Sequence, residues 1–108
     1  MTDPAKRPAL LSGRTERFHL GCGSLYVTVN TDSDGQPFEV FATLGKAGGC
    51  AHVMLEGLCR LVSLYLRHGL PLEGVTKYLS EIRCPNSAWE DGVELLSCPD
   101  CIARALSS

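Results

Sequence analysis

The sequence of 108 residues has few aromatic side chains and no large excess of charge of either sign. It contains one Trp, three Tyr and three Phe, so any hydrophobic core must be mostly aliphatic. Ten basic and twelve acidic residues give a formal net charge of −2. Domains that bind double-stranded nucleic acid usually carry a basic surplus, because phosphate contacts supply most of their affinity. We therefore do not expect a nucleic-acid partner.

Long hydrophobic runs are also missing from the sequence. No uninterrupted apolar run approaches the roughly 20 residues that span a bilayer. The first residues contain Lys6 and Arg7, but no apolar stretch of signal-peptide length follows them. We therefore expect no membrane association and a cytoplasmic protein, whose thiols are kept reduced.

Three strands are predicted in the first half of the sequence. Residues 1–13 contain Pro4 and Pro8 and little periodicity, which predicts a flexible leader before a single domain over 14–108. Apolar residues alternate with polar ones over three segments, at 14–20, 24–30 and 38–44. Asp34-Gly35 supplies a turn between the last two segments. This pattern predicts an edge strand followed by a β-hairpin.

Three helices are predicted after the strands, over 51–68, 72–82 and 97–106, with a loop over 83–94. In the long helix a polar stripe is formed by His52, Glu56, Arg60, Ser63 and Arg67. We expect the apolar remainder of that helix to cover the sheet: Val53, Met54, Leu55, Leu58, Leu61, Val62, Tyr65 and Leu66. The order predicts an α+β domain, in which a small three-stranded antiparallel sheet is covered by one long and two shorter helices.

Six cysteines are the most informative feature of the sequence. In a reducing compartment such a surplus indicates metal binding or redox chemistry more often than disulfides. Cys59 lies among apolar neighbours in the long helix and is predicted to belong to the core. The four cysteines at element boundaries are candidate ligands of a tetrahedral zinc or iron site: Cys22, Cys50, Cys84 and Cys98. The alternative is that they are small buried hydrophobic side chains.

Topology and helix capping add two expectations about these cysteines. The end of a hairpin's second strand lies beside the start of its first, so Cys50 should come close to Cys22. Cys98 begins the last helix, with Ser97 as N-cap and Asp100 three residues later. We expect the helix dipole to favour a thiolate at Cys98.

Two further motifs give competing functional hypotheses. Cys98 and Cys101 form a CxxC pair at a helix start, which is typical of a dithiol redox relay. The same sulfurs cannot ligate a metal and exchange disulfides at once.

The loop 45–49, which contains Lys46, precedes a helix but lacks the Ser or Thr of a phosphate-binding loop. With Tyr26 it gives a third hypothesis, a nucleotide or single-strand binding module, which the acidic pI disfavours.

Four stretches in order resemble the TSCPD domain family: Gly21–Asn30, Gly45–Cys50, Arg83–Pro85 and Leu96–Leu106. The resemblance covers about residues 14 to 106. In that family the domain occurs near the C-terminus of adenosylcobalamin-dependent class II ribonucleotide reductases and as a separate small protein. Its recurrent cysteines match Cys22, Cys50, Cys84 and Cys98, so the resemblance implies bound zinc. Cys101 departs from the family, which usually has a small apolar residue there.

The resemblance implies an accessory or interaction module of ribonucleotide reductase, acting in deoxynucleotide synthesis. The reductase's catalytic barrel, with its radical cysteine, nucleotide site and cobalamin site, has no counterpart in these 108 residues. We therefore expect no catalysis by this chain alone and no cobalamin site in it. The sequence leaves open whether the domain acts alone, as a homo-oligomer or docked on a larger chain.

Overall fold

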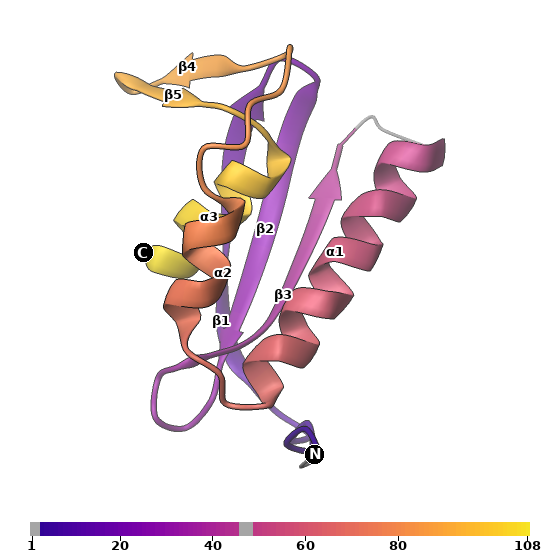
Figure 1. Ribbon diagram of the computed structural model, residues 1–108, viewed down its shortest axis with the longest axis vertical. Helices are drawn as coiled ribbons and strands as arrows, with labels where there is room; N and C mark the ends of the chain where they lie inside the picture. The colour runs from indigo at the N-terminus through magenta and orange to yellow at the C-terminus, as the bar shows by residue number, and fades with distance from the viewer. Residues whose placement is uncertain (1–2, 46–48) are drawn as a thin grey trace.

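The computed structural model describes residues 3–45 and 49–108. Its elements follow in this order: β1 (Ser12–Leu20), β2 (Gly23–Thr31), β3 (Pro37–Leu44), α1 (Gly49–Arg67), α2 (Leu72–Leu79), β4 (Ala88–Glu90), β5 (Val93–Leu95) and α3 (Cys98–Ser107). The first three strands form an antiparallel sheet in the order β1-β2-β3. Helix α1 lies along β3, whereas α2 and α3 lie at the β1–β2 side of the sheet (Figure 1). The expected α+β architecture is confirmed.

One hydrophobic cluster joins the sheet to all three helices. The alternation predicted for the strands is observed, because the inward-facing side chains are almost all buried: Phe18, Leu20, Leu25, Val27, Val29, Val40, Ala42 and Leu44. Helix α1 adds Leu55, Cys59, Val62 and Leu66 to this cluster, and α3 adds Ile102 and Leu106. Cys59 is therefore a core residue, as the sequence predicts.

Helix α1 covers the free edge of β3. The Ser63 hydroxyl accepts a hydrogen bond from the Val40 amide at 3.0 Å and donates to the Val40 carbonyl oxygen at 3.2 Å. One turn earlier, the buried Cys59 thiol lies against the backbone of Ala42, which partly offsets the rise in the Cys59 pKa caused by burial. An uncovered edge strand is a template for unwanted strand pairing. The helix therefore satisfies part of an edge that the sheet leaves unpaired.

The sequence-based assignment of the α1 faces is partly wrong. Val53, Met54 and Leu61, which we expected to cover the sheet, are 62%, 73% and 68% exposed. Ser63, which we expected in a solvated stripe, is half-buried against β3. The cause is the position of α1 beside the edge strand. A helix at a sheet edge buries a narrower face than a helix that lies across a sheet.

The segment between α2 and α3 also differs from the prediction. Helix α2 ends at Leu79 rather than Ile82, because Ser80 is extended and Glu81 has a positive φ of 66°. The expected loop contains the antiparallel hairpin β4–β5. Asp91 and Gly92 at its turn have φ of 50° and 79°, as a type I′ turn requires. Asp-Gly between short apolar segments is a hairpin signal that the sequence reading missed.

By length and composition alone, α1 is apolar enough to cross a membrane, with a mean hydropathy of 1.2 over 18 residues. The sequence reading did not anticipate this, because Glu56 and Arg60 interrupt the apolar run. One such helix is a weak signal; 22% of that window is buried, and α1 contributes four side chains to the core.

Candidate cysteine site

The start of α3 is held in place by hydrogen bonds and an ion pair of Ser97 and Asp100. The Ser97 hydroxyl is the N-cap and accepts a hydrogen bond from the Asp100 amide at 3.2 Å. The Asp100 carboxylate accepts hydrogen bonds from the Glu81 amide at 3.0 Å and the Leu96 amide at 3.3 Å. It also pairs with Arg104 at 3.1 Å. The predicted capping arrangement is confirmed, with Leu96 rather than Ser97 as the reciprocal partner.

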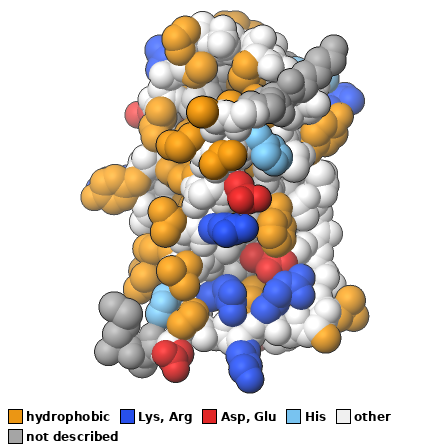
Figure 2. All heavy atoms as spheres, turned by 90° about the vertical axis from the view of Figure 1, so that its right-hand side faces the viewer, with side chains coloured by type: hydrophobic (Ala, Val, Ile, Leu, Met, Phe, Trp, Pro, Cys, Tyr) orange, Lys and Arg blue, Asp and Glu red, His pale blue; other side chains and the backbone are white. Residues whose placement is uncertain are grey.

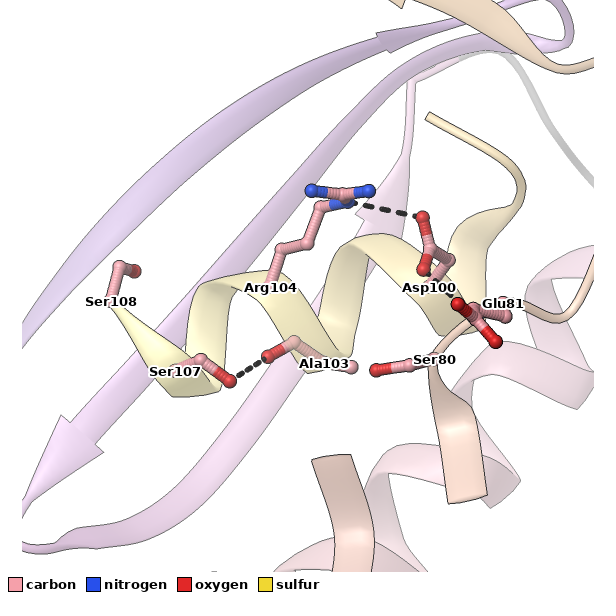
Figure 3. Close-up of a pocket in the computed structure, with 7 residues that line it drawn as sticks. All are labelled: Ser80, Glu81, Asp100, Ala103, Arg104, Ser107 and Ser108. Carbon is pink, nitrogen blue, oxygen red and sulfur yellow. Dashed lines mark hydrogen bonds and ion pairs between the residues drawn. The ribbon is translucent and has the colours of Figure 1, made fainter. Parts of the chain in front are cut away.

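Three of these residues, Glu81, Asp100 and Arg104, line a hollow of about 490 Å³ between α3 and the end of α2 (Figure 3). Of its two carboxylates, that of Asp100 is fully engaged, whereas Glu81 takes part in these hydrogen bonds only through its backbone amide. Burial by itself would raise the pKa of Asp100, but the hydrogen bonds from Glu81, Arg104 and Leu96 outweigh it and hold the pKa below its usual range. The carboxylate is therefore a structural group that ties α2 to α3.

Backbone hydrogen bonds bring three cysteine-bearing segments together. The Gly21 amide donates to the Asn86 carbonyl oxygen at 2.8 Å, which joins the β1–β2 turn to the loop after Cys84. A Cβ at Gly21 would lie 2.6 Å from that oxygen, so only glycine permits this approach. The Cys84 amide donates to the Leu96 carbonyl oxygen at 2.9 Å, two residues before Cys98.

The thiols of Cys22 and Cys84 are consequently both close enough to act on Cys98. The pKa of Cys98 is raised to about 11, first by burial and then by the neighbouring thiols of Cys22 and Cys84. The expectation of a thiolate at Cys98 is therefore wrong for the metal-free protein, because desolvation outweighs the helix terminus. Like groups gathered in this way repel one another once ionised, and a cation would remove that repulsion.

Cys84 has an additional polar contact. The Asn86 amide points at the Cys84 sulfur at 3.5 Å, across the intervening Pro85. An N–H directed at sulfur stabilises negative charge there, and such contacts orient the thiolate ligands of metal sites. Cys84 is half-buried and Cys22 is exposed, so this end of the molecule is open to solvent.

Cys50 is placed differently from the other three predicted ligands. It lies exposed in the first turn of α1 and is not among the groups that act on Cys98. Its expected approach to Cys22 depends on the loop before α1, of which residues 46–48 lie outside the described part of the chain. The anion-binding hypothesis for Lys46 falls on those same residues. Its other member, Tyr26, is 40% exposed on the outward face of β2.

The CxxC pair has the wrong environment for a dithiol relay. Cys101 is fully buried, and its pKa is raised to about 12, first by burial and then by the Asp100 carboxylate. An attacking cysteine needs an accessible thiolate near neutral pH. The burial that raises the pKa of Cys98 and Cys101 favours their thiol forms, which disfavours redox exchange through this pair.

Thiolates are ligands that suit a soft divalent cation chemically. Zinc in structural sites takes four thiolate or imidazole ligands. Over residues 3–45 and 49–108, no group of three or more His, Cys, Asp or Glu side chains is already arranged around a single point. Closing such a site therefore requires rotation of side chains in the exposed turn and a fourth ligand.

Comparison with known proteins gives one family. A family model described as the TSCPD domain matches residues 2–108. The match extends beyond the resemblance seen in the sequence and includes most of the N-terminal segment. No solved structure matches the chain.

Proposed function

Because the chain belongs to the TSCPD domain family, we propose that it is a zinc-stabilised accessory domain that binds a ribonucleotide reductase or a related nucleotide enzyme. The observation that supports the proposal is that the thiols of Cys22 and Cys84, from two other segments, both act on Cys98. The association with the reductase rests on the family resemblance alone.

A metal at this end of the molecule has a clear physical role. The β1–β2 turn, the loop around Cys84 and the start of α3 are held together mainly by single backbone hydrogen bonds. A domain of about 100 residues buries a modest share of its surface, so a metal clip adds substantially to its stability. Cys22, Cys84 and Cys98 would supply three ligands, and Cys50 is our candidate for the fourth.

The metal is tested by elemental analysis of protein purified without added metal. We expect about one zinc per chain, and a melting temperature that falls on dialysis against a strong chelator and recovers when zinc is returned. Cys22→Ser, Cys84→Ser and Cys98→Ser should each lose the metal. Cys50→Ser tests the fourth ligand: loss of zinc in this variant would assign Cys50, and retention of zinc would exclude it.

Cys59→Ala is the matched control, because this buried thiol contacts the β3 backbone and none of the other cysteines. It should lower stability while retaining zinc. Protein without zinc whose melting temperature is unchanged by chelator would end the metal proposal.

The partner is tested separately with a purified adenosylcobalamin-dependent reductase. Titration calorimetry with zinc-loaded protein should show saturable binding, which the metal-free protein and Cys98→Ser should lose. Absence of binding to the reductase by zinc-loaded protein would remove this part of the proposal.

A further inference from the structure

Helix α1 carries an apolar surface on the side turned away from the core. We define the α1 strip as Val53, Met54, Gly57, Leu61 and Leu64. Its four large side chains are 62%, 73%, 68% and 44% exposed, in that order. A helix on the surface of a globular domain normally presents polar residues to solvent. A contiguous exposed apolar surface marks an interaction site.

The spacing of the strip favours a second helix as the occupant. Met54, Gly57, Leu61 and Leu64 recur at intervals of three, four and three residues, which is the repeat of a helix–helix seam. Gly57 lies at the middle of the strip, and a Cβ there would have no heavy atom within 4 Å. A glycine at this point lets the backbone of another helix come close.

Charge lies along only one side of the strip. Arg60 pairs with Glu56 at 3.4 Å, and both side chains are mostly exposed. Figure 2 shows a column of charged and histidine side chains down the middle of this face, with hydrophobic side chains gathered beside it. The column lines the groove between α1 and β3, which also contains His52 and Arg67. On its other side the strip is bordered by Leu58, which is partly buried and packs on the core.

When two copies of α1 pack antiparallel, the charged side of one strip lies beside the charged side of the other. A two-fold axis between two antiparallel helices brings the same side of each helix together. Arg60 of one chain then lies two residues, about 3 Å along the helix axis, from the level of Glu56 of the other, and the same holds for the reverse pair. The apolar residues match in one register, because Gly57 meets Leu61 and Met54 meets Leu64. A parallel pair would instead set charged residues against the apolar side.

We propose that α1 is the interface of a homodimer, in which two copies of the strip pack antiparallel about a two-fold axis near residues 57–61. The contact from Val53 to Leu64 is about 17 Å long at the rise of an α-helix. An interface of this size is small, so the dimer is expected to be weak, with a dissociation constant of about 10–100 µM. The proposal does not depend on the bound metal or on the reductase.

The test is sedimentation velocity of the full chain, in reducing buffer to prevent disulfides through Cys22 or Cys50, from about 5 to 500 µM. The wild-type protein should shift from monomer to dimer with concentration. Leu61→Glu should remain monomeric, because it places two like charges at the centre of the interface. Tyr78→Glu is the control, since Tyr78 is 74% exposed on α2 and lies outside the strip. It should dimerise like the wild type.

Charge reversal tests the antiparallel register. Glu56→Arg alone and Arg60→Glu alone gather four like charges along the seam, and each should weaken the dimer about tenfold. The double variant Glu56→Arg/Arg60→Glu exchanges the partners and should restore wild-type association. Double-variant association as weak as that of the single variants would overturn the antiparallel arrangement.

Two outcomes would overturn the dimer itself. One is a wild-type monomer at all concentrations. The other is a monomer that binds phosphatidylglycerol vesicles and loses this binding in Leu61→Glu, which would assign the strip to a membrane surface. All variants should keep wild-type circular dichroism, because each changed side chain is exposed.

Discussion

Glu39 is a carboxylate almost removed from water, although it points to the outward face of the sheet. It accepts hydrogen bonds from Arg7 at 2.9 and 3.0 Å and from Asn30 at 2.6 Å. Burial would raise its pKa, but the hydrogen bonds and the charge of Arg7 outweigh burial and hold the pKa below its usual range. Glu39 therefore attaches the N-terminal segment to the sheet through a charged contact.

This contact predicts a pH-dependent stability. A carboxyl with a lowered folded-state pKa stabilises the protein above its unfolded pKa of about 4.3, and the contribution disappears as pH falls through the folded value. Glu39→Gln should lower the free energy of unfolding by about 1–3 kcal/mol at pH 7. The difference from the wild type should shrink as pH falls below about 4.

Urea unfolding at pH 7, 5, 4 and 3 measures this dependence. Glu16→Gln on the exposed part of β1 is the control and should follow the wild type at every pH. A constant difference between Glu39→Gln and the wild type from pH 7 to 3 would contradict the assignment.

At the scale of elements, α1 and β3 are joined by the side chain of Ser63. Its hydroxyl is the partner of both polar backbone groups of Val40 at the free edge of the sheet. Ser63→Ala removes that partner from two half-buried groups and should lower the free energy of unfolding by about 1–3 kcal/mol. Urea unfolding and hydrogen exchange of the Val40 amide measure the effect.

Ser63→Thr is the matched variant, because it retains the hydroxyl and adds one methyl group. We expect it to restore slow exchange at Val40, with a smaller loss of stability than Ser63→Ala. Equal exchange rates at Val40 in Ser63→Ala and the wild type would show that the hydroxyl does not protect the edge.

At the scale of the whole molecule, one side chain joins the first strand to the last helix. Arg14 in β1 donates hydrogen bonds to the carbonyl oxygens of Ala105 at 2.6 Å and Ser108 at 2.8 Å. The end of a helix carries unpaired carbonyl groups and a partial negative charge, both of which a guanidinium satisfies. Arg14 thus joins β1 to the end of α3, which lies 91 residues later in the sequence.

Arg14→Ala should therefore fray the last turn of α3 and lower the free energy of unfolding by about 1–2 kcal/mol. The measurement is urea unfolding, together with amide exchange in residues 103–107. Arg17→Ala is the control, since Arg17 is exposed on the same strand and points to the opposite face. An equal loss of stability in the two variants would contradict a specific role for Arg14.

The sequence alone determined the three strands of the main sheet, the three helices and the core position of Cys59, because burial on one face imposes a period of two or of 3.6 residues. It also determined the N-cap at Ser97, since capping depends on residues only three positions apart. The β4–β5 hairpin also depends on adjacent residues, because its signal is the Asp91-Gly92 pair at the turn.

Only the tertiary structure decided which apolar residues are buried and which thiols meet. Val53, Met54 and Leu61 are hydrophobic enough for a core, but the docking of α1 at the sheet edge leaves them in solvent. Cys22 and Cys84 act on the Cys98 thiol because two backbone hydrogen bonds join distant segments. Periodicity describes a residue's own element, whereas these outcomes depend on where that element lies against others.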